Sequence, residues 1–170
     1  NLYIFDAEFL KNNKEILRIY ASKSFKKVTT GFRKIFNKEN DKTIFSKVKR
    51  LNNFRKTYNY KIKKLINNLK KNKKKICAIS AAPRGCVLLN APNFTKNDIK
   101  FVGEVKNSIK IKKLIPGTDI PILNEKMLIK KKADFIIILA WHLKNRLRKI
   151  LLRNGYKGKF VVPLPHLKIS

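Results

Sequence analysis

Hydrophobic and polar positions change their period near residue 73. Beyond that point, short apolar runs alternate with stretches in which apolar residues recur every three or four positions. The runs predict buried strands and the longer period predicts amphipathic helices. The expected strands are 76–80, 99–105, 134–140 and 159–163, with a short extended piece at 120–123, and the expected helices end near 90, 131 and 154. Alternating strands and helices need right-handed crossovers. We therefore expect an α/β, Rossmann-like three-layer domain with a mainly parallel sheet over residues 73–170.

The first 22 residues show a different pattern. Two strand-like runs, 2–9 and 16–21, are joined by the polar stretch 11–15. This arrangement predicts an antiparallel β-hairpin. Because an isolated hairpin is only marginally stable, we expect it to complete a larger sheet. The hairpin is interpreted as the end of a preceding domain.

A helical linker is expected over residues 23–72. Part of 23–43 is compatible with a short helix, and apolar steps of three and four run from Ile44 to about Leu69 without Pro or Gly. This predicts a long basic amphipathic helix. We favour a helix packed on a neighbouring domain with a solvated outer face, the alternative being a membrane-surface or nucleic-acid element. The lysine-rich run 70–75 marks the next boundary.

The large net positive charge of the chain says less about its function than its size suggests. The 170 residues include 42 Lys and Arg against 10 Asp and Glu, a formal net charge of +32. A polyanion partner is one explanation. AT-biased codon usage is the other, and we favour it because Lys far outnumbers Arg and the charge is spread from Lys11 to Lys168. No apolar run approaches the roughly 20 residues of a membrane helix.

The two cysteines indicate no metal site. Cys77 and Cys86 flank the turn at 80–85, without a CxxC motif or a histidine at metal-ligand spacing. A reduced, cytoplasmic protein is the simplest interpretation. The chain lacks an initiator Met and begins within an apolar pattern, so we expect it to be a fragment.

The turn between the strand at 76–80 and the following helix is the main candidate site. Its candidate residues are Ser80, Ala81, Ala82, Arg84 and Gly85. Such turns lie outside the carboxyl ends of strands, where ligands bind, and a helix N-terminus there favours a phosphate. Arg84 would add a fork of donors, although it is equally compatible with an ordinary surface arginine. The turn departs from the G-x-G-x-x-G pattern, which argues against NAD.

Three further candidates follow other predicted strands. Glu104 ends the strand at 99–105, where an acid can accept a hydrogen bond from a ribose hydroxyl, and a surface acid is the alternative. Trp141 and His142 follow the strand at 134–140. Trp141 is more often a core residue than a stacking platform, and His142 more often caps or packs than catalyses. No spacing indicates a nucleophile–base pair.

Four segments in order resemble one known family. They are Ser80–Asn90, Ile115–Ile122, Asp134–His142 and Gly158–Pro165. They are similar to motifs in the C-terminal domain of S-adenosylmethionine-dependent sugar C-methyltransferases. Residues 3–22 resemble the last hairpin of the methyl-donor domain that precedes it in that family.

The resemblance implies a division of labour. An upstream domain would bind S-adenosylmethionine and carry a Tyr-x-Glu-His catalytic segment, which this sequence lacks. This chain would complete the cleft for a nucleotide-linked keto-sugar, bind no cofactor itself and be inactive alone. In the family, a base removes a proton beside the keto group and the enolate attacks the methyl group. The alternative is a basic nucleic-acid-binding α/β domain without enzymatic activity. Four motifs in order favour the methyltransferase interpretation, because lysines accumulate more easily than ordered motifs.

Overall fold

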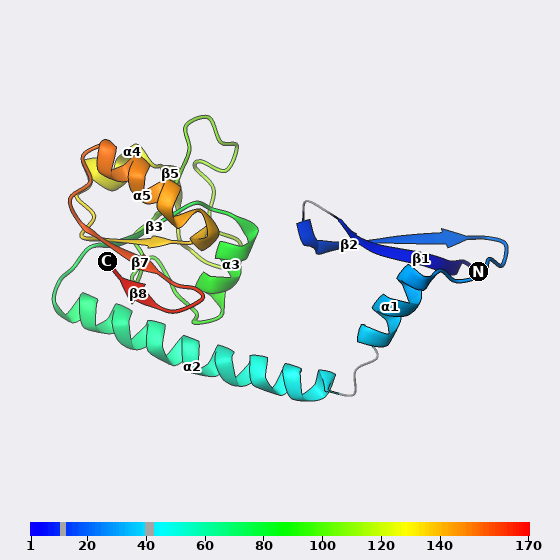
Figure 1. The fold of residues 1–170 in the computed structure, drawn as a ribbon. Helices are drawn as coiled ribbons and strands as arrows, with labels where there is room; N and C mark the ends of the chain where they lie inside the picture. Colours follow the sequence, from blue (N-terminus) through cyan, green and yellow to red (C-terminus); the bar gives the residue numbers. More distant parts are fainter. Residues whose placement is uncertain (11–12, 40–42) are drawn as a thin grey trace. The chain divides into compact units, whose positions relative to one another are not determined.

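The computed structural model describes residues 1–10, 13–39 and 43–170, which form two compact units, 1–53 and 54–170 (Figure 1). Among the described residues, no helix combines the length and the apolar character needed to cross a membrane.

The first unit contains a β-hairpin and a short helix. Strands β1 (Tyr3–Leu10) and β2 (Asn13–Ser22) pair antiparallel, as expected from their apolar runs. Helix α1 (Thr30–Glu39) begins where the Thr29 hydroxyl accepts a hydrogen bond from the Phe32 N–H at 3.1 Å. The same hydroxyl donates to the Asp6 carboxylate. This bond and the 2.9 Å bond from the Thr29 N–H to the Phe5 carbonyl fix the start of α1 against β1.

Helix α2 (Ile44–Lys71) is the longest element and contains ten Lys and Arg residues but no Asp or Glu. From Phe54 onward it belongs to the second unit. Its apolar stripe is buried there through Ile62, Ile66 and Leu69. The Lys- and Asn-rich remainder of the helix is exposed.

The second unit is built on a mainly parallel sheet of six strands in the order β5-β4-β3-β6-β7-β8. Five strands are parallel, and β8 pairs antiparallel with β7. The strands are β3 (Ile76–Ile79), β4 (Val102–Glu104), β5 (Ile122–Asn124), β6 (Phe135–Ile138), β7 (Lys159–Val162) and β8 (Lys168–Ile169). The expected strand at 99–105 is thus shorter than predicted. The extended piece at 120–123 becomes an edge strand, and β8 was not predicted.

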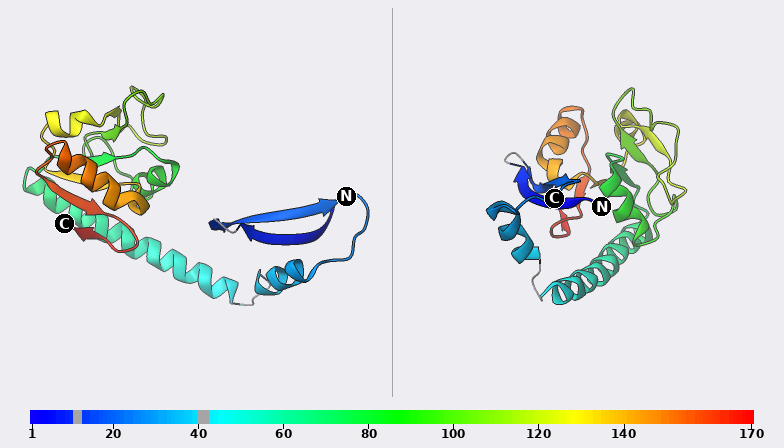
Figure 2. Two further views of the ribbon diagram at one scale, coloured as in Figure 1. Left: turned by 45° about the horizontal axis from the view of Figure 1, so that its top comes forward. Right: turned by 90° about the vertical axis from the view of Figure 1, so that its right-hand side faces the viewer.

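Helices pack on both faces of this sheet (Figures 1 and 2). Besides α2, the helices are α3 (Pro83–Asn90), α4 (Lys126–Lys130), the short 3₁₀ helix η1 (Trp141–Leu143) and α5 (Lys144–Arg153). Side chains alternate along each strand, because successive residues of a strand point to opposite faces. In β3, Ile76 and Ala78 join a core cluster with residues of α2 and α3. Cys77 and Ile79 join a second cluster with residues of α4 and α5.

The Pro-Gly-Thr segment forms the expected tight turn. The Thr118 N–H donates to the Ile115 carbonyl at 3.0 Å, and Gly117 between them has φ +78°. Proline followed by a residue of positive φ is the pattern of a type II turn. Asn90 at the end of α3 holds this turn, because its side-chain amide donates to the Pro116 carbonyl at 2.8 Å. The turn is therefore attached to α3.

Candidate functional site

The loops at the carboxyl ends of the parallel strands define the candidate site. The chain runs from β3 through β4 to the edge strand β5, and then returns to β6 on the other side of β3. Where the direction of winding reverses in this way, a crevice opens outside the strand ends, and ligands of open α/β sheets bind there. The turn after β3 lies at this point.

Ser80 occupies a backbone conformation that residues other than glycine rarely adopt. It follows β3 directly and has φ +74°. Its N–H donates to the Gly103 carbonyl at 2.8 Å, so the ladder between β3 and β4 continues up to the turn. A left-handed conformation costs a non-glycine residue about 1–2 kcal/mol. Backbone strain of this kind is concentrated at ligand-contacting turns.

Glu104 and Lys110 hold the peptide groups on either side of Ala81. The Glu104 carboxylate accepts a hydrogen bond from the Ala81 N–H at 2.8 Å, and its other oxygen accepts from the Val105 N–H at 3.1 Å. The Lys110 ammonium donates to the Ala81 carbonyl at 2.9 Å and lies 4.0 Å from the Glu104 carboxylate. Glu104 is largely buried, whereas Lys110 is about half exposed. The structure thus joins the predicted Glu104 to the predicted turn.

The start of α3 offers fewer backbone donors than the sequence suggested. The Ala81 N–H is taken by Glu104, and the Ala82 N–H donates to the Ser80 carbonyl at 2.8 Å. Pro83 has no N–H, and the N–H groups of Gly85 and Cys86 both donate to the Ala82 carbonyl. At the Ala81 N–H, a phosphate would have to displace Glu104. A hydroxyl would not, because a carboxylate can accept further hydrogen bonds from O–H donors.

Gly85 is required for packing within the domain. A Cβ atom at this position would lie 2.8 Å from the Leu139 Cβ, closer than such atoms ever come. The absence of a side chain lets α3 approach the segment that follows β6. Arg84, one residue earlier, lies exposed in the first turn of α3. The close approach therefore fixes where the first turn of α3 stands above the sheet.

Trp141 and His142 belong to η1, after β6, and face different surroundings. Trp141 is half-buried and packs against the core cluster of the α4–α5 face. His142 is exposed, and its ring lies 6.0 Å from the Trp141 ring in an edge-on arrangement. Both follow a strand's carboxyl end, as expected. Glu104, by contrast, contacts the turn that leads into α3 on the opposite face.

A hollow of about 410 Å³ opens beside the turn, between α3 and the loop 105–121. It is lined by Ala81, Pro83, Cys86, Lys110, Lys113, Leu114, Ile115, Pro116 and Ile122. The sequence did not single out Lys110 or Lys113. They stand among other lysines of the same loop, and nothing in the pattern separates them from solvated charges.

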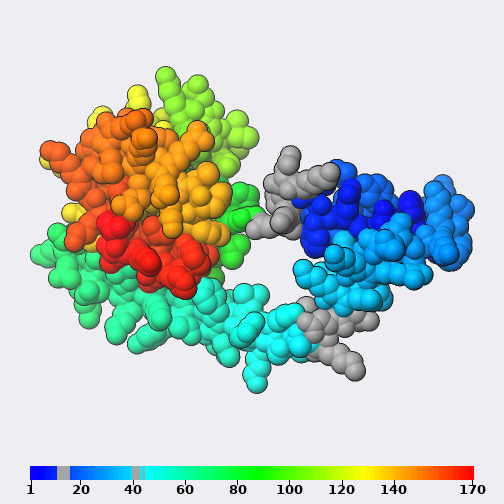
Figure 3. Space-filling view, in the orientation of Figure 1, coloured from blue at the N-terminus to red at the C-terminus, as the bar shows by residue number. Residues whose placement is uncertain are grey.

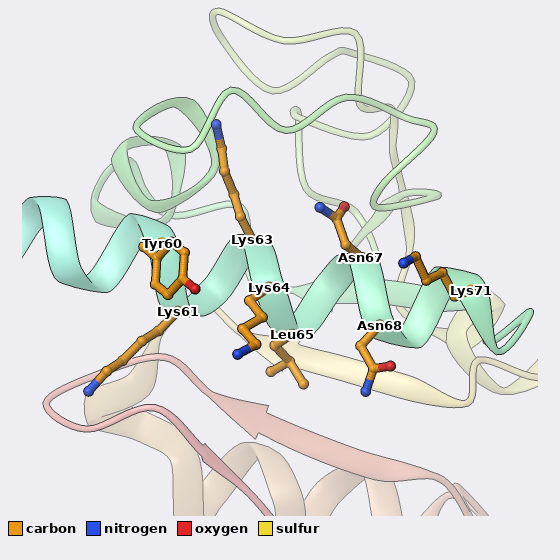
Figure 4. A pocket seen from close by; sticks show the side chains of 8 residues that line it. All are labelled: Tyr60, Lys61, Lys63, Lys64, Leu65, Asn67, Asn68 and Lys71. Carbon is orange, nitrogen blue, oxygen red and sulfur yellow. The ribbon is translucent and has the colours of Figure 1, made fainter.

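A second hollow, of about 840 Å³, runs along α2 (Figure 4). All eight of its lining residues come from this helix, and Figure 4 shows Lys61 and Lys64 extending to one side of it and Lys63 to the other. The lining is basic and polar apart from Tyr60 and Leu65, and it contains no carboxylate. Its charged residues are all lysines. Within residues 1–10, 13–39 and 43–170, no three His, Cys, Asp or Glu side chains gather closely enough to hold a metal ion.

Comparisons with known proteins identify the family of the chain. A family model described as the C-methyltransferase C-terminal domain matches residues 16–165, which is most of the chain. The C-methyltransferase NovU of Streptomyces niveus is 27% identical over 111 residues, which cover 64% of this chain and 26% of that protein. The matched region is about a quarter of the relative's length. The chain belongs to the C-methyltransferase C-terminal domain family.

Proposed function

We propose that this chain forms the acceptor-side part of an S-adenosylmethionine-dependent C-methyltransferase and binds a nucleotide-linked keto-sugar. Family membership supports the reaction class. The strand order supports the location of the site, because in chain order the five parallel strands run 3-2-1-4-5, as in Rossmann-like sheets. The proposal assigns methyl-donor binding and proton abstraction to an upstream domain, and not to the residues described here.

The contact between Glu104 and Ala81 is the observation that carries the proposal. It places a largely buried carboxylate at the carboxyl end of β4, beside a strained turn at the reversal point of the sheet. Each Glu104 oxygen accepts one backbone N–H, so the carboxylate has capacity for sugar hydroxyls. Ser80, Ala82, Arg84 and Gly85 form the adjoining surface. Trp141 and His142 are the candidates on the other side of β3.

The turn does not fit S-adenosylmethionine or a dinucleotide. Both need close approach of the backbone, and here Cβ atoms stand at Ala81 and Ala82 while their N–H groups are engaged within the protein. We therefore assign no residue of this chain to the methyl donor. The role proposed for these residues is to bind and orient the acceptor.

Titration calorimetry with thymidine diphosphate glucose tests the proposal on the full chain. We expect the nucleotide sugar to bind, and we expect pyrophosphate at the same concentration to compete with it only weakly. Glu104→Gln should weaken it about tenfold, which corresponds to about 1.4 kcal/mol and to one charge-assisted hydrogen bond. Circular dichroism would verify that the variant is folded.

Glu125→Gln is the matched control, because it removes the same charge from the neighbouring strand end without a described side-chain hydrogen bond. Its affinity should equal that of the unaltered chain. Equal affinity for pyrophosphate and the nucleotide sugar, with no difference between the two Gln variants, would reduce the observed binding to charge attraction and refute the proposal.

A further inference from the structure

The hollow between α3 and the loop 105–121 has an apolar interior beside the candidate site. Ile115 and Ile122 form its floor and are 1% and 3% exposed. Ala81 and Pro83 line it from the α3 side, and Leu114 lines it from the loop. A volume of about 410 Å³ falls within the range of roughly 300–1,000 Å³ that is usual for small-molecule sites. The hollow can therefore hold a compact apolar group.

Two lysines supply the only charges in its lining. Lys110 donates to the Ala81 carbonyl, and Lys113 is exposed on the same loop. No acid belongs to the lining residues. A ligand that suits these walls has an apolar body and an anionic end. A polyhydroxylated sugar does not, because its hydroxyls would lose water against Ile115, Ile122 and Leu114 without gaining partners.

We propose that this hollow receives the nucleobase of the nucleotide, with the phosphates held at Lys110 and Lys113. The inference rests on the proposed function and specifies which half of the ligand lies here. Continuity supports it, because Ala81 lines the hollow and also donates to Glu104. Lys110 connects the same two places, since it lines the hollow and lies 4.0 Å from the Glu104 carboxylate. The sugar would then extend from the phosphates toward Glu104.

The chain contains a natural reporter for occupancy of the hollow. Its two cysteines are free thiols, and only Cys86 lines the hollow. Cys77 lies in β3 with no exposed surface, and burial raises its pKa to about 12. The reactive thiolate of Cys77 is therefore scarce near neutral pH. N-ethylmaleimide should alkylate Cys86 alone in the folded chain, which peptide mass analysis can verify.

Protection of Cys86 from N-ethylmaleimide is the test. Thymidine diphosphate at about ten times its dissociation constant should slow alkylation about tenfold, because only the unoccupied fraction reacts. Thymidine should protect at higher concentrations, and pyrophosphate should not. Equal protection by pyrophosphate or by octanoate would overturn the inference, since the hollow would then select charge or general apolarity instead of a base.

Loop variants provide a second measurement by calorimetry. Leu114→Asp, on the wall of the hollow, should weaken thymidine diphosphate binding at least tenfold, whereas Ile109→Asp, more exposed on the same loop and outside the hollow, should not. Lys113→Met should weaken binding and Lys106→Met should not. Nucleotide binding that leaves Cys86 unprotected and insensitive to Leu114 would refute the base pocket and leave the proposed function standing. An absence of nucleotide binding would refute both.

Discussion

Glu104 and Ala81, 23 positions apart in sequence, meet where two neighbouring parallel strands end, and the Glu104 carboxylate accepts the Ala81 N–H at 2.8 Å. The bond lies beside the turn that connects β3 to α3. It fills the place that an anion would take at a helix N-terminus. The site is thereby better suited to hydrogen-bond donors than to a phosphate on the backbone.

Removing the Glu104 carboxylate should weaken the domain. Glu104→Ala leaves the largely buried Ala81 N–H without its acceptor, so we expect the free energy of unfolding to fall by about 1–3 kcal/mol. Glu104→Gln keeps an acceptor oxygen and should lose less. Urea denaturation followed by circular dichroism measures both. Glu125→Ala should change the value by less than about 0.5 kcal/mol. Equal losses at positions 104 and 125 would contradict a structural role for the bond.

Ser80→Gly should stabilise the chain. Glycine removes the left-handed penalty of about 1–2 kcal/mol, and its greater freedom when unfolded returns about 0.5–1 kcal/mol of this gain. A net increase of about 0.5–1 kcal/mol in the free energy of unfolding is expected from urea denaturation. Ser80→Ala keeps the Cβ atom and should be nearly neutral. If alanine stabilised the chain as much as glycine, the positive φ would not be the cause.

Gly85→Ala sets helix propensity against packing. In an exposed helix, alanine in place of glycine gains about 1 kcal/mol. Here the new Cβ would lie 2.8 Å from the Leu139 Cβ, and overpacking of this kind costs about 1–3 kcal/mol. We expect a net loss of stability in thermal unfolding, with a larger loss for Gly85→Val. A gain at position 85 would mean that α3 does not approach the β6 end as closely as described.

The ion pair between Lys70 and Asp98 should make stability pH-dependent. Burial alone would raise the pKa of Asp98, but hydrogen bonds from the Lys70 ammonium at 2.5 Å and from Thr95 lower it on balance. A carboxyl with a depressed folded pKa stabilises the fold above its unfolded pKa of about 3.9, and this contribution is lost as pH falls through the folded pKa. Urea denaturation between pH 2 and 6 should show a steeper acid loss for the unaltered chain than for Asp98→Asn.

Lys70→Met is the complementary variant. It removes the hydrogen bond that contributes most to lowering the pKa of Asp98. The pKa of Asp98, followed by NMR, should therefore rise, and the loss of stability between pH 6 and pH 2 should become smaller, because the folded and unfolded pKa values of Asp98 then differ less. An unchanged Asp98 pKa in Lys70→Met would show that Thr95 alone accounts for the shift.

The parallel strands could be predicted because burial on both faces leaves a run of apolar residues that the sequence shows directly. Phe135–Ile138 is the clearest case, since all four residues are buried. The edge strands could not be predicted in the same way. β5 and β8 have three and two residues, and their pairing depends on neighbours distant in sequence. The hydrogen bonds between β3 and the segment that leads into β4 also begin before β4 itself, because the Lys100 N–H donates to the Ile76 carbonyl at 2.9 Å.

The candidate site was only partly predictable. The small-residue turn and Glu104 could be proposed because each follows an apolar run, and strand ends meet at one edge of a parallel sheet. The hydrogen bond between them could not be predicted, since the sequence does not show toward which face of the sheet the Glu104 side chain points. Lys110 could not be separated from the other 41 basic residues by composition or spacing. Only the fold of the loop 105–121 places its ammonium on the Ala81 carbonyl.

Strand β8 has a consequence for how these molecules meet one another. The C-terminal residues lie on the surface beside α5 (Figure 3), where the Phe160 N–H donates to the Ser170 carbonyl at 2.8 Å and Ser170 donates back at 3.0 Å. These bonds cover one edge of β7, a strand whose last three residues are buried and apolar. An uncovered edge of this kind is a template for strands of other molecules. The short strand β8 therefore protects the sheet against aggregation. A chain trimmed before Lys168 would expose the edge of β7, which could then pair with the same strand of another molecule.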